Sequence, residues 1–276
     1  MIMGQNRKMK MHKNHNILKS KANDGSLRFL HKSRKRAFSV AEVLITLAVI
    51  GVVAGYVVPT INIKIQEQMW VSKLKRSYTL LNNSYQSAVR KYGSPKYWGL
   101  TPGFQDLESG VAYFTDSEKF YARLLEGLKY EYVKDILPPQ PTNYLNNSDK
   151  AILKDDGFEM QPLFRLHDGT TFFHSWFNKA GCAAYNTNAC GDFTVDLNGA
   201  DAPNVAGIDQ FVFLYNENSI IPLGYPNHIQ GTNNRTVEGA CLAKESIKYN
   251  GYGCTAWVIE RGTMPWLKGK QPKWSK

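Results

Sequence analysis

The chain has 276 residues, an ordinary apolar content of 43% and a formal net charge of +11, which is enough length for one large domain or two small ones. Residues 1–37 hold 11 of the 34 Lys and Arg residues and one of the 23 Asp and Glu residues, so the rest of the chain is nearly neutral. A nucleic-acid-binding body normally carries its basic surface in the folded domain. This charge distribution therefore argues against such a body, and no nucleic acid is expected as its partner.

The first element expected after the basic segment 1–37 is an apolar helix. Residues 38–58 read FSVAEVLITLAVIGVVAGYVV, and as a helix they reach about 31 Å, the thickness of a bilayer's hydrocarbon core. Four basic residues lie just before this run, within 32–36, which places the N-terminus in the cytoplasm. The run is longer than the apolar core of a signal peptide, and no small-residue cleavage site follows it. It is expected to stay as a single-pass anchor, with everything after Pro59 on the far side of the membrane.

Glu42 is the one side chain in this run that is charged at neutral pH. A carboxylate inside a membrane helix costs about 2.5–3.5 kcal/mol on insertion scales, and such residues are usually functional and have a partner. The alternative is a residue near the interface whose carboxylate reaches the headgroups and has no further role.

The string RAFSVAEVL, residues 36–44, resembles the processing site of type IV prepilins and type II secretion pseudopilins. In that family a basic leader ends in a small residue, a Phe follows, and a Glu is the fifth residue of the mature chain. The resemblance implies that Ala37 ends the leader, that Phe38 becomes the new N-terminus, and that Glu42 is the family's glutamate. Gly51 and Pro59 match the small and helix-bending residues of the family's membrane span.

The resemblance also implies a processing enzyme, a modification and a filament. In the family a membrane-embedded prepilin peptidase cuts before the Phe and N-methylates the new amine, which makes Phe38 the expected methylated residue. The Glu then pairs with the positive N-terminus of a neighbouring subunit. The implied partners are the peptidase, other pilin subunits, the inner-membrane assembly platform and membrane lipid. A carboxylate in the membrane needs a cationic partner, and cleavage creates one at Phe38.

An amphipathic helix is expected over residues 59–93. Apolar residues recur at steps of mostly three to five from Ile61 to Tyr92, the spacing of one helix face, and Gly93-Ser94-Pro95 ends the pattern. Joined to the apolar run, this gives one long helix. Half of it is expected in the membrane, and the other half is expected to dock on a head formed by 94–276.

The head is expected to contain both helices and strands. Thr115-Asp116-Ser117-Glu118 has the pattern of a capping box before a short helix. Asp168-Gly169 lies between two β-prone runs, which is a hairpin signal. FTVDLNG (193–199) and FVFLYNENSIIPL (211–223) form a second strand pair, with a turn at 216–219. The expected fold class is α+β, with an antiparallel sheet packed against the second half of the long helix.

The four cysteines are Cys182, Cys190, Cys241 and Cys254, and they allow three pairings. Neither local pair has the close C-x-x-C spacing of a zinc knuckle, and no histidines cluster beside them. Disulfides are typical of segments outside the cytoplasm. We favour the local pairs, Cys182 with Cys190 and Cys241 with Cys254.

A metal site is considered only around Asp196, Asn198, Gly199 and Asp201. The resemblance adds that major pseudopilins often hold calcium in a C-terminal loop. The run lacks the complete spacing of an EF-hand and its closing Glu. An Asn-Gly turn with solvated acids is therefore favoured, no cofactor is expected, and calcium is the alternative.

No enzyme is expected, because G-x-S-x-G, P-loop and H-E-x-x-H motifs are absent from the sequence. His167 and His174 flank the Asp168-Gly169 turn and are interpreted as ordinary polar or turn residues. The sequence thus favours a structural filament subunit. Two alternatives stay open. One is a minor or tip subunit whose head binds a secreted substrate, DNA or a surface, and the other is a single-pass anchored protein that never polymerises.

Overall fold

A computed structural model describes residues 38–100, 104–105, 112–113, 116–138, 140–141, 143–146, 159–177, 181–183, 186–230, 233–245 and 247–274. The expected leader, including Ala37 at the expected cut, lies outside these residues. The chain divides into two compact units, Met1–Gly51 and Val52–Lys276. Each unit is described by itself below.

Helix α1 (Val40–Tyr92) begins in the first unit and ends in the second. In the second unit its face toward the core repeats at steps of three, four and seven, and its buried residues are Glu67, Trp70, Val71, Leu74, Ser77, Leu81, Tyr85 and Ala88. Ile61, Ile65 and Met69, which belong to the expected apolar face, are exposed instead. The helix continues through residue 59, but the side chain of Pro59 lies outside those that the structure describes.

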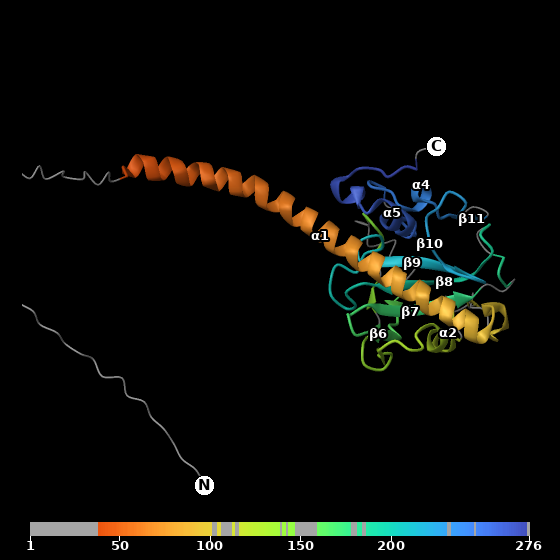
Figure 1. Ribbon diagram of the computed structural model, residues 1–276. Coiled ribbons are helices and arrows are strands. Elements are labelled where there is room, and N and C mark those ends of the chain that lie inside the picture. The colour runs from red at the N-terminus through yellow and green to blue at the C-terminus, as the bar shows by residue number, and fades with distance from the viewer. Residues whose placement is uncertain are drawn as a thin grey trace, which may run out of the picture. The chain divides into compact units, whose positions relative to one another are not determined.

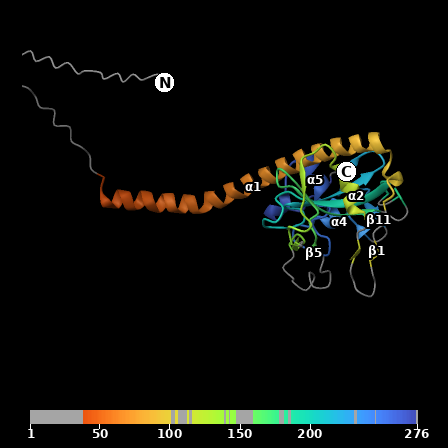
Figure 2. The same cartoon turned by 90° about the horizontal axis from the view of Figure 1, so that it is seen from below.

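A six-stranded antiparallel sheet forms the centre of the second unit, in the order β10-β9-β8-β7-β6-β3 (Figure 1). Its strands are β3 (Tyr130–Tyr132), β6 (Phe164–Leu166), β7 (Thr171–Phe177), β8 (Ala189–Asp196), β9 (Gln210–Asn216) and β10 (Ile220–Pro222). In both views the last part of α1 runs along this sheet (Figures 1 and 2). The predicted α+β class with an antiparallel sheet is confirmed.

Short elements surround the sheet. Three two-stranded pairs are β1 (Phe104–Gln105) with β2 (Ala112–Tyr113), β4 (Gln140–Pro141) with β5 (Glu159–Met160), and β11 (Ile229–Gln230) with β12 (Asn233–Asn234). The remaining helices are η1 (Pro95–Tyr97), α2 (Ser117–Leu124), α4 (Val237–Ala240), α5 (Cys254–Arg261) and η2 (Pro265–Lys268).

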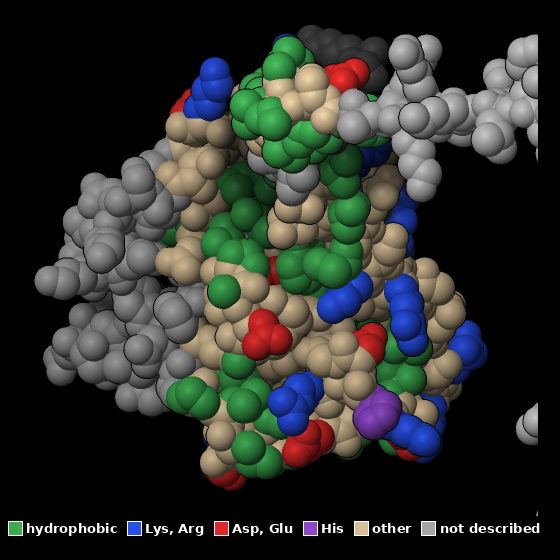
Figure 3. Space-filling view, turned by 90° about the vertical axis from the view of Figure 1, so that its left-hand side faces the viewer, with side chains coloured by type: hydrophobic (Ala, Val, Ile, Leu, Met, Phe, Trp, Pro, Cys, Tyr) green, Lys and Arg blue, Asp and Glu red, His purple; other side chains and the backbone are tan. Residues whose placement is uncertain are grey.

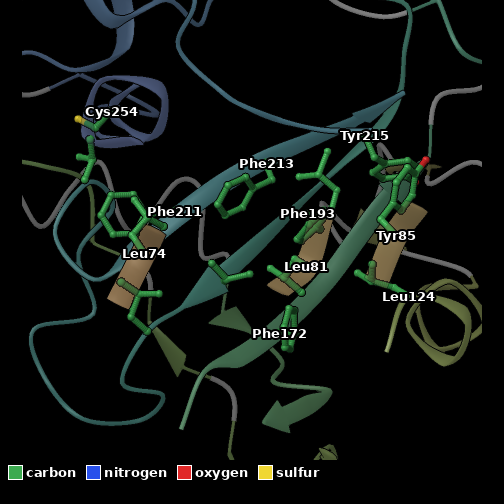
Figure 4. Close-up of a cluster of buried hydrophobic side chains, with 14 of the residues drawn as sticks. Leu74, Leu81, Tyr85, Leu124, Phe172, Phe193, Phe211, Phe213, Tyr215 and Cys254 are labelled. Atoms are coloured by element: carbon green, nitrogen blue, oxygen red, sulfur yellow. The ribbon is translucent and has the colours of Figure 1, made fainter. Parts of the chain in front are cut away.

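The main core is aromatic and joins α1 and α2 to the sheet (Figure 4). Phe120 of α2 stacks on Tyr215 of β9 with ring centroids 4.5 Å apart, and Phe193 of β8 stacks on Phe213 of β9 at 5.7 Å. These four side chains are at most 1% exposed. Burial of each such ring stabilises the fold by about 1.5–3 kcal/mol, and favourable ring pairs add about 0.5–1.5 kcal/mol.

Both predicted hairpin turns are confirmed. Phe164 of β6 pairs with Phe172 of β7, and the Asp168 carboxylate accepts the Thr170 N–H at 3.1 Å across the turn. Ile220 of β10 pairs with Tyr215 of β9 beyond the second turn, at 216–219. In that turn the Asn216 side chain accepts the N–H groups of Asn218 at 2.9 Å and Ser219 at 2.8 Å. In both turns a short acceptor side chain thus replaces a backbone partner.

The two outer edges of the sheet differ. At the β10 edge, the Ile220 N–H donates to Asn82 of α1 at 3.1 Å, and the Tyr78 hydroxyl of α1 donates to the Ile220 carbonyl at 3.4 Å. Helix α1 therefore supplies the hydrogen bonds that another strand would supply. At the opposite edge, β3 pairs with β6, and among the described residues no strand follows it.

Helix α2 is present where the sequence predicts a short helix. The N-cap residue is Asp116, at a φ of 63°, and its side chain does not cap the helix, while Thr115 lies outside the described residues. The helix start is tied to the sheet by Ser117, whose hydroxyl accepts the Ser175 N–H at 3.0 Å and donates to the Ser175 carbonyl at 3.1 Å. Glu118 forms an ion pair with Lys134 at 2.8 Å.

Two disulfides, Cys182–Cys190 and Cys241–Cys254, have the local pairing that the sequence favours. Cys241 follows α4 and Cys254 opens α5, and both are fully buried. The bond therefore closes the 242–253 loop. A cross-link of this kind typically stabilises a fold by about 2–4 kcal/mol, mainly by restricting the unfolded chain.

Candidate functional site

The N-terminal motif is described from Phe38 onward, and there Glu42 has a local partner. The Glu42 N–H donates to the Ser39 hydroxyl at 3.2 Å, and the Ser39 N–H donates to the Glu42 carboxylate at 3.4 Å. This reciprocal pair is a capping box at the start of α1. Its sequence signature, Ser39-Val40-Ala41-Glu42, lies within the processing motif, and sequence analysis misses it there. The Glu42 carboxylate therefore accepts a main-chain N–H at the start of its own helix.

The helix beyond this cap is apolar on every side. All described side chains from 38 to 55 are exposed, and Phe38 and Val40 reach 79% and 76%. Gly51 faces open space, because a Cβ at this position would have no neighbouring atom within 4 Å. A helix that is apolar all round is normally buried in a large core or a membrane.

No helix in the described part of the chain has the length and apolar content that a bilayer crossing requires. The side chains of residues 56–60 are not among those described.

In the second unit, two buried carboxylates organise the segment between β8 and β9. Asp196, the last residue of β8, is 0% exposed. Its Oδ1 accepts the N–H groups of Asn198 at 3.0 Å and Gly199 at 2.8 Å, and its Oδ2 accepts Nε2 of Gln210 at 3.0 Å. The Asn204 amide lies 3.1 Å from Oδ2 and donates to it when its nitrogen faces the carboxylate. Asp196 thus holds the turn that follows it.

Asp209, the second of these carboxylates, precedes β9, and sequence analysis misses it. It is 0% exposed and accepts the N–H groups of Asn204 at 2.8 Å and Val205 at 2.7 Å. Burial raises the pKa of Asp209, while these backbone donors oppose the rise. The burial of Asp209 cannot be predicted from the sequence, because a single Asp before a strand is equally typical of an exposed loop.

Burial and, to a lesser extent, the neighbouring Asp209 raise the pKa of Asp196 to about 7, against the lowering effect of the donors. The expectation of solvated acids is therefore wrong for Asp196, although Asp201 is exposed. The expected turn itself is present, with Gly199 at a φ of 70°. Sequence analysis misses the burial because it depends on packing between strands.

The same segment is the candidate for calcium. Asn198 donates to the Asp201 carbonyl at 2.8 Å, and its own Oδ1 is buried without a hydrogen-bond partner. Among the described residues, no group of three or more His, Cys, Asp and Glu side chains is arranged to hold a metal ion. The oxygens of Asp196 already accept bonds from backbone and amide donors, so a cation here would have to displace those donors. The segment acts as a turn scaffold, and calcium is the alternative that the resemblance implies.

His228 is a second buried titratable group that sequence reasoning misses. It is 1% exposed, and its Nδ1 accepts the N–H groups of Gly224 at 2.8 Å and Tyr225 at 3.1 Å. Burial lowers its pKa to about 4. The acceptor role requires the neutral ring, so His228 supports the 224–228 turn as an uncharged residue. His167, by contrast, is exposed, and the side chain of His174 is outside the described ones.

The low pKa of His228 predicts a loss of stability in acid. The pKa of His228 is 6.5 in the unfolded chain and about 4 in the folded chain. The free energy of unfolding is therefore highest above pH 6.5 and falls as the pH is lowered from 6.5 to about 4. The loss at this site is expected to reach about 3 kcal/mol. Unfolding of the wild type and of His228→Asn, which keeps an acceptor near Nδ1, is to be measured from about pH 7 to about pH 4. The difference between the two is expected to grow in favour of the variant as the pH falls, and a constant difference would contradict the assignment.

Comparisons of this chain with family models, with curated proteins and with solved structures give no match.

Proposed function

We propose that this chain is a pilin-like structural subunit of a type II secretion pseudopilus or a type IV pilus. The observation that carries the proposal is the ordered co-occurrence of a basic leader, a small residue before Phe38, Glu42 and the apolar run 38–58. Each of these features is common alone, but their order and spacing are those of the prepilin processing site. The subunit is a structural component and not an enzyme.

The apolar run is proposed to anchor the chain in the inner membrane, with the N-terminus in the cytoplasm and the head outside. Support comes from the exposed apolar side chains on all sides of residues 38–55, which need lipid or neighbouring helices around them. It also comes from the basic residues before the run. Residues 59–93 form the amphipathic half, and 94–276 form the head. Burial of Leu74, Leu81 and Tyr85 supports the docking of that half.

Glu42 is proposed to have two roles, one before assembly and one after cleavage. Before assembly it caps its own helix through Ser39. After cleavage, the new amine at Phe38 of a neighbouring subunit offers a full positive charge, which a carboxylate in a low-dielectric environment binds more strongly than a neutral N–H. Processing therefore precedes assembly, because the cationic partner does not exist earlier.

The intact mass of the chain isolated from membranes tests the proposal. The expected mature chain begins at Phe38 and carries one added methyl group. Ala37→Leu should block cleavage because it removes the small residue before the cut, whereas Ala41→Leu, a matched change inside the apolar run, should be processed normally. A chain that keeps residues 1–37, or begins elsewhere, would support the non-polymerising anchored protein instead.

A minor or tip subunit is the second candidate. The head and helix after the cut comprise 239 residues, which is long for a major pseudopilin of the family that the motif resembles. Its head would then bind a substrate, DNA or a surface. Abundance separates the two cases, because a major subunit dominates sheared filaments and a tip subunit is scarce and located at one end.

A further inference from the structure

The β3 edge of the sheet has main-chain groups that face away from the sheet. The Val133 N–H donates to the Leu163 carbonyl at 2.8 Å, and Glu131 lies opposite Arg165 on β6. Main-chain groups of alternate residues face opposite sides of a strand. Because Glu131 and Val133 face β6, the N–H and C=O groups of Tyr130 and Tyr132 face outward. Among the described residues no hydrogen bond to these outward groups is found.

The two faces of this edge differ in chemistry. Tyr130 and Tyr132 both pack on Phe164 of β6, with ring centroids 5.4 Å and 5.3 Å apart, and they keep 43% and 38% of their surface exposed. Side chains alternate along a strand, so Lys129 and Glu131 lie on the other face. One face of β3 is therefore aromatic and the other is charged.

A cavity of about 380 Å³ opens beside the charged face at the first residues of β3. It is lined by Lys129, Tyr130, Glu131, Arg165, Leu166, His167 and Gly169. Figure 3 shows a face of the second unit on which Lys and Arg side chains lie beside acidic side chains and a histidine. The cavity thus combines a strand edge with charged side chains.

The charges that line the cavity favour a bound segment with an acidic side chain. Arg165 is neutralised by Glu131 at 2.7 Å, and the nearby Asp168 carboxylate accepts the Thr170 N–H of its own turn. Within the described residues, Lys129 has no ion-pair partner, and it is exposed. The cation that is left to pair with an incoming group is therefore Lys129, with His167 beside it.

We propose that β3 is a docking strand for an extended segment of another protein. The segment adds antiparallel to the outward groups of Tyr130 and Tyr132, in the way that peptides extend an exposed sheet edge. An acidic side chain of the segment lies in the cavity beside Lys129, and the apolar side chains one and three residues before it contact Tyr130 and Tyr132. The inference does not depend on the proposed function, because the edge is equally open in an anchored protein that never polymerises.

The choice of an acidic, alternating segment follows from the register. A residue opposite Lys129 shares the charged face, and opposite charges on directly facing residues stabilise a strand pair. In the antiparallel register the residue before it lies opposite Tyr130, and the residue three before it lies opposite Tyr132, both on the aromatic face. Since the β10 edge is hydrogen-bonded by α1, β3 is the edge at which a strand can be added.

A blocked peptide with the pattern Val-Thr-Val-Glu-Thr, whose valines lie opposite Tyr132 and Tyr130 and whose Glu lies opposite Lys129, tests the proposal, with its Glu→Gln form and a form that is N-methylated at both valines as controls. Binding to the full chain in detergent is measured by calorimetry. The acidic peptide is expected to bind about threefold more tightly than the Gln peptide. The N-methylated peptide is expected to lose about tenfold in affinity, because it cannot donate to the strand edge.

Two variants of the chain locate the site. Lys129→Gln should remove the preference for Glu over Gln, while Lys244→Gln, at another exposed lysine, should leave it unchanged. Equal binding of the acidic and Gln peptides to the wild type, or of the N-methylated and unmodified peptides, would overturn the proposal. So would self-association of the chain that Lys129→Gln abolishes, since a second copy would then occupy the edge.

Discussion

Replacing Glu42 with Gln is expected to abolish filament assembly while leaving membrane insertion in place. Gln is as compatible as Glu with a capping box, so the bonds with Ser39 can persist. What is lost is the negative charge that would meet the amine of a neighbouring subunit. Loss of one partner from a buried ion pair costs about 3–5 kcal/mol, a factor of about 10² to several thousand in each subunit's association. Filaments sheared from cells and counted by microscopy provide the measurement.

The matched control for this variant is Ser39→Ala, which removes the cap and keeps the charge. Loss of an N-cap typically costs about 1 kcal/mol, so Ser39→Ala should still assemble. Cleavage before Phe38 is to be verified by mass in both variants, because an unprocessed chain has no new amine. Assembly of Glu42→Gln at the wild-type level would mean that the residue is only a helix cap, and the pairing role would be lost.

Replacing Asp196 with Asn is expected to stabilise the second unit, and more strongly at higher pH. The folded-state pKa of about 7 is raised above the unfolded value of 3.8. The contribution of Asp196 to the stability of the fold is therefore most favourable at a pH below its unfolded-state pKa, and it is lost as the pH rises through its folded-state pKa. The resulting penalty at about pH 8 is about 4 kcal/mol, against about 2 kcal/mol near pH 5. Asn has no such penalty.

The surroundings of Asp196 can accept this change. Oε1 of Gln210 is buried without a hydrogen-bond partner, so rotation of that amide presents an acceptor to the new NH2 group. Asn204 can present its own oxygen in the same way. The N–H groups of Asn198 and Gly199 keep their acceptor, because Asn retains an oxygen at the Oδ1 position.

Tryptophan fluorescence measures this prediction, since all six tryptophans lie in the second unit. Unfolding of wild type and Asp196→Asn is to be compared at about pH 5 and about pH 8. Asp201→Asn is the control, because Asp201 is exposed and should give little change at either pH. A stabilisation by Asp196→Asn that does not grow with pH would show that the carboxyl is not the source of the penalty. His228 has the opposite pH trend, so its variant must be measured separately.

The parts of the fold that depend on local chemistry are predictable from the sequence. Asp168 and Gly169 specify a tight turn whatever surrounds them, and the alternating runs on both sides then fix which strands pair. The α+β class follows from these hairpins together with the helical spacing. The local cysteine pairs follow from proximity along the chain.

The remaining features depend on residues that meet only after folding. The start of α2 is held by Ser117, which bonds to β7, and this contact has no signature in the sequence, whereas the capping signature at residues 39–42 does form a capping box. Asp209 and His228 have no motif around them, and their altered pKa values arise from burial between elements far apart in sequence. The open β3 edge is likewise visible only once the strand order is known.

The unequal edges of the sheet limit how many chains can be joined through it. A sheet open at both sides can add copies without end, as in a fibre. Here the contacts from Asn82 and Tyr78 stop growth on one side. Two copies of this chain paired through β3 would form a joint sheet whose outer edges are both β10, so edge pairing between copies cannot go beyond two chains, and a longer filament must grow through other surfaces.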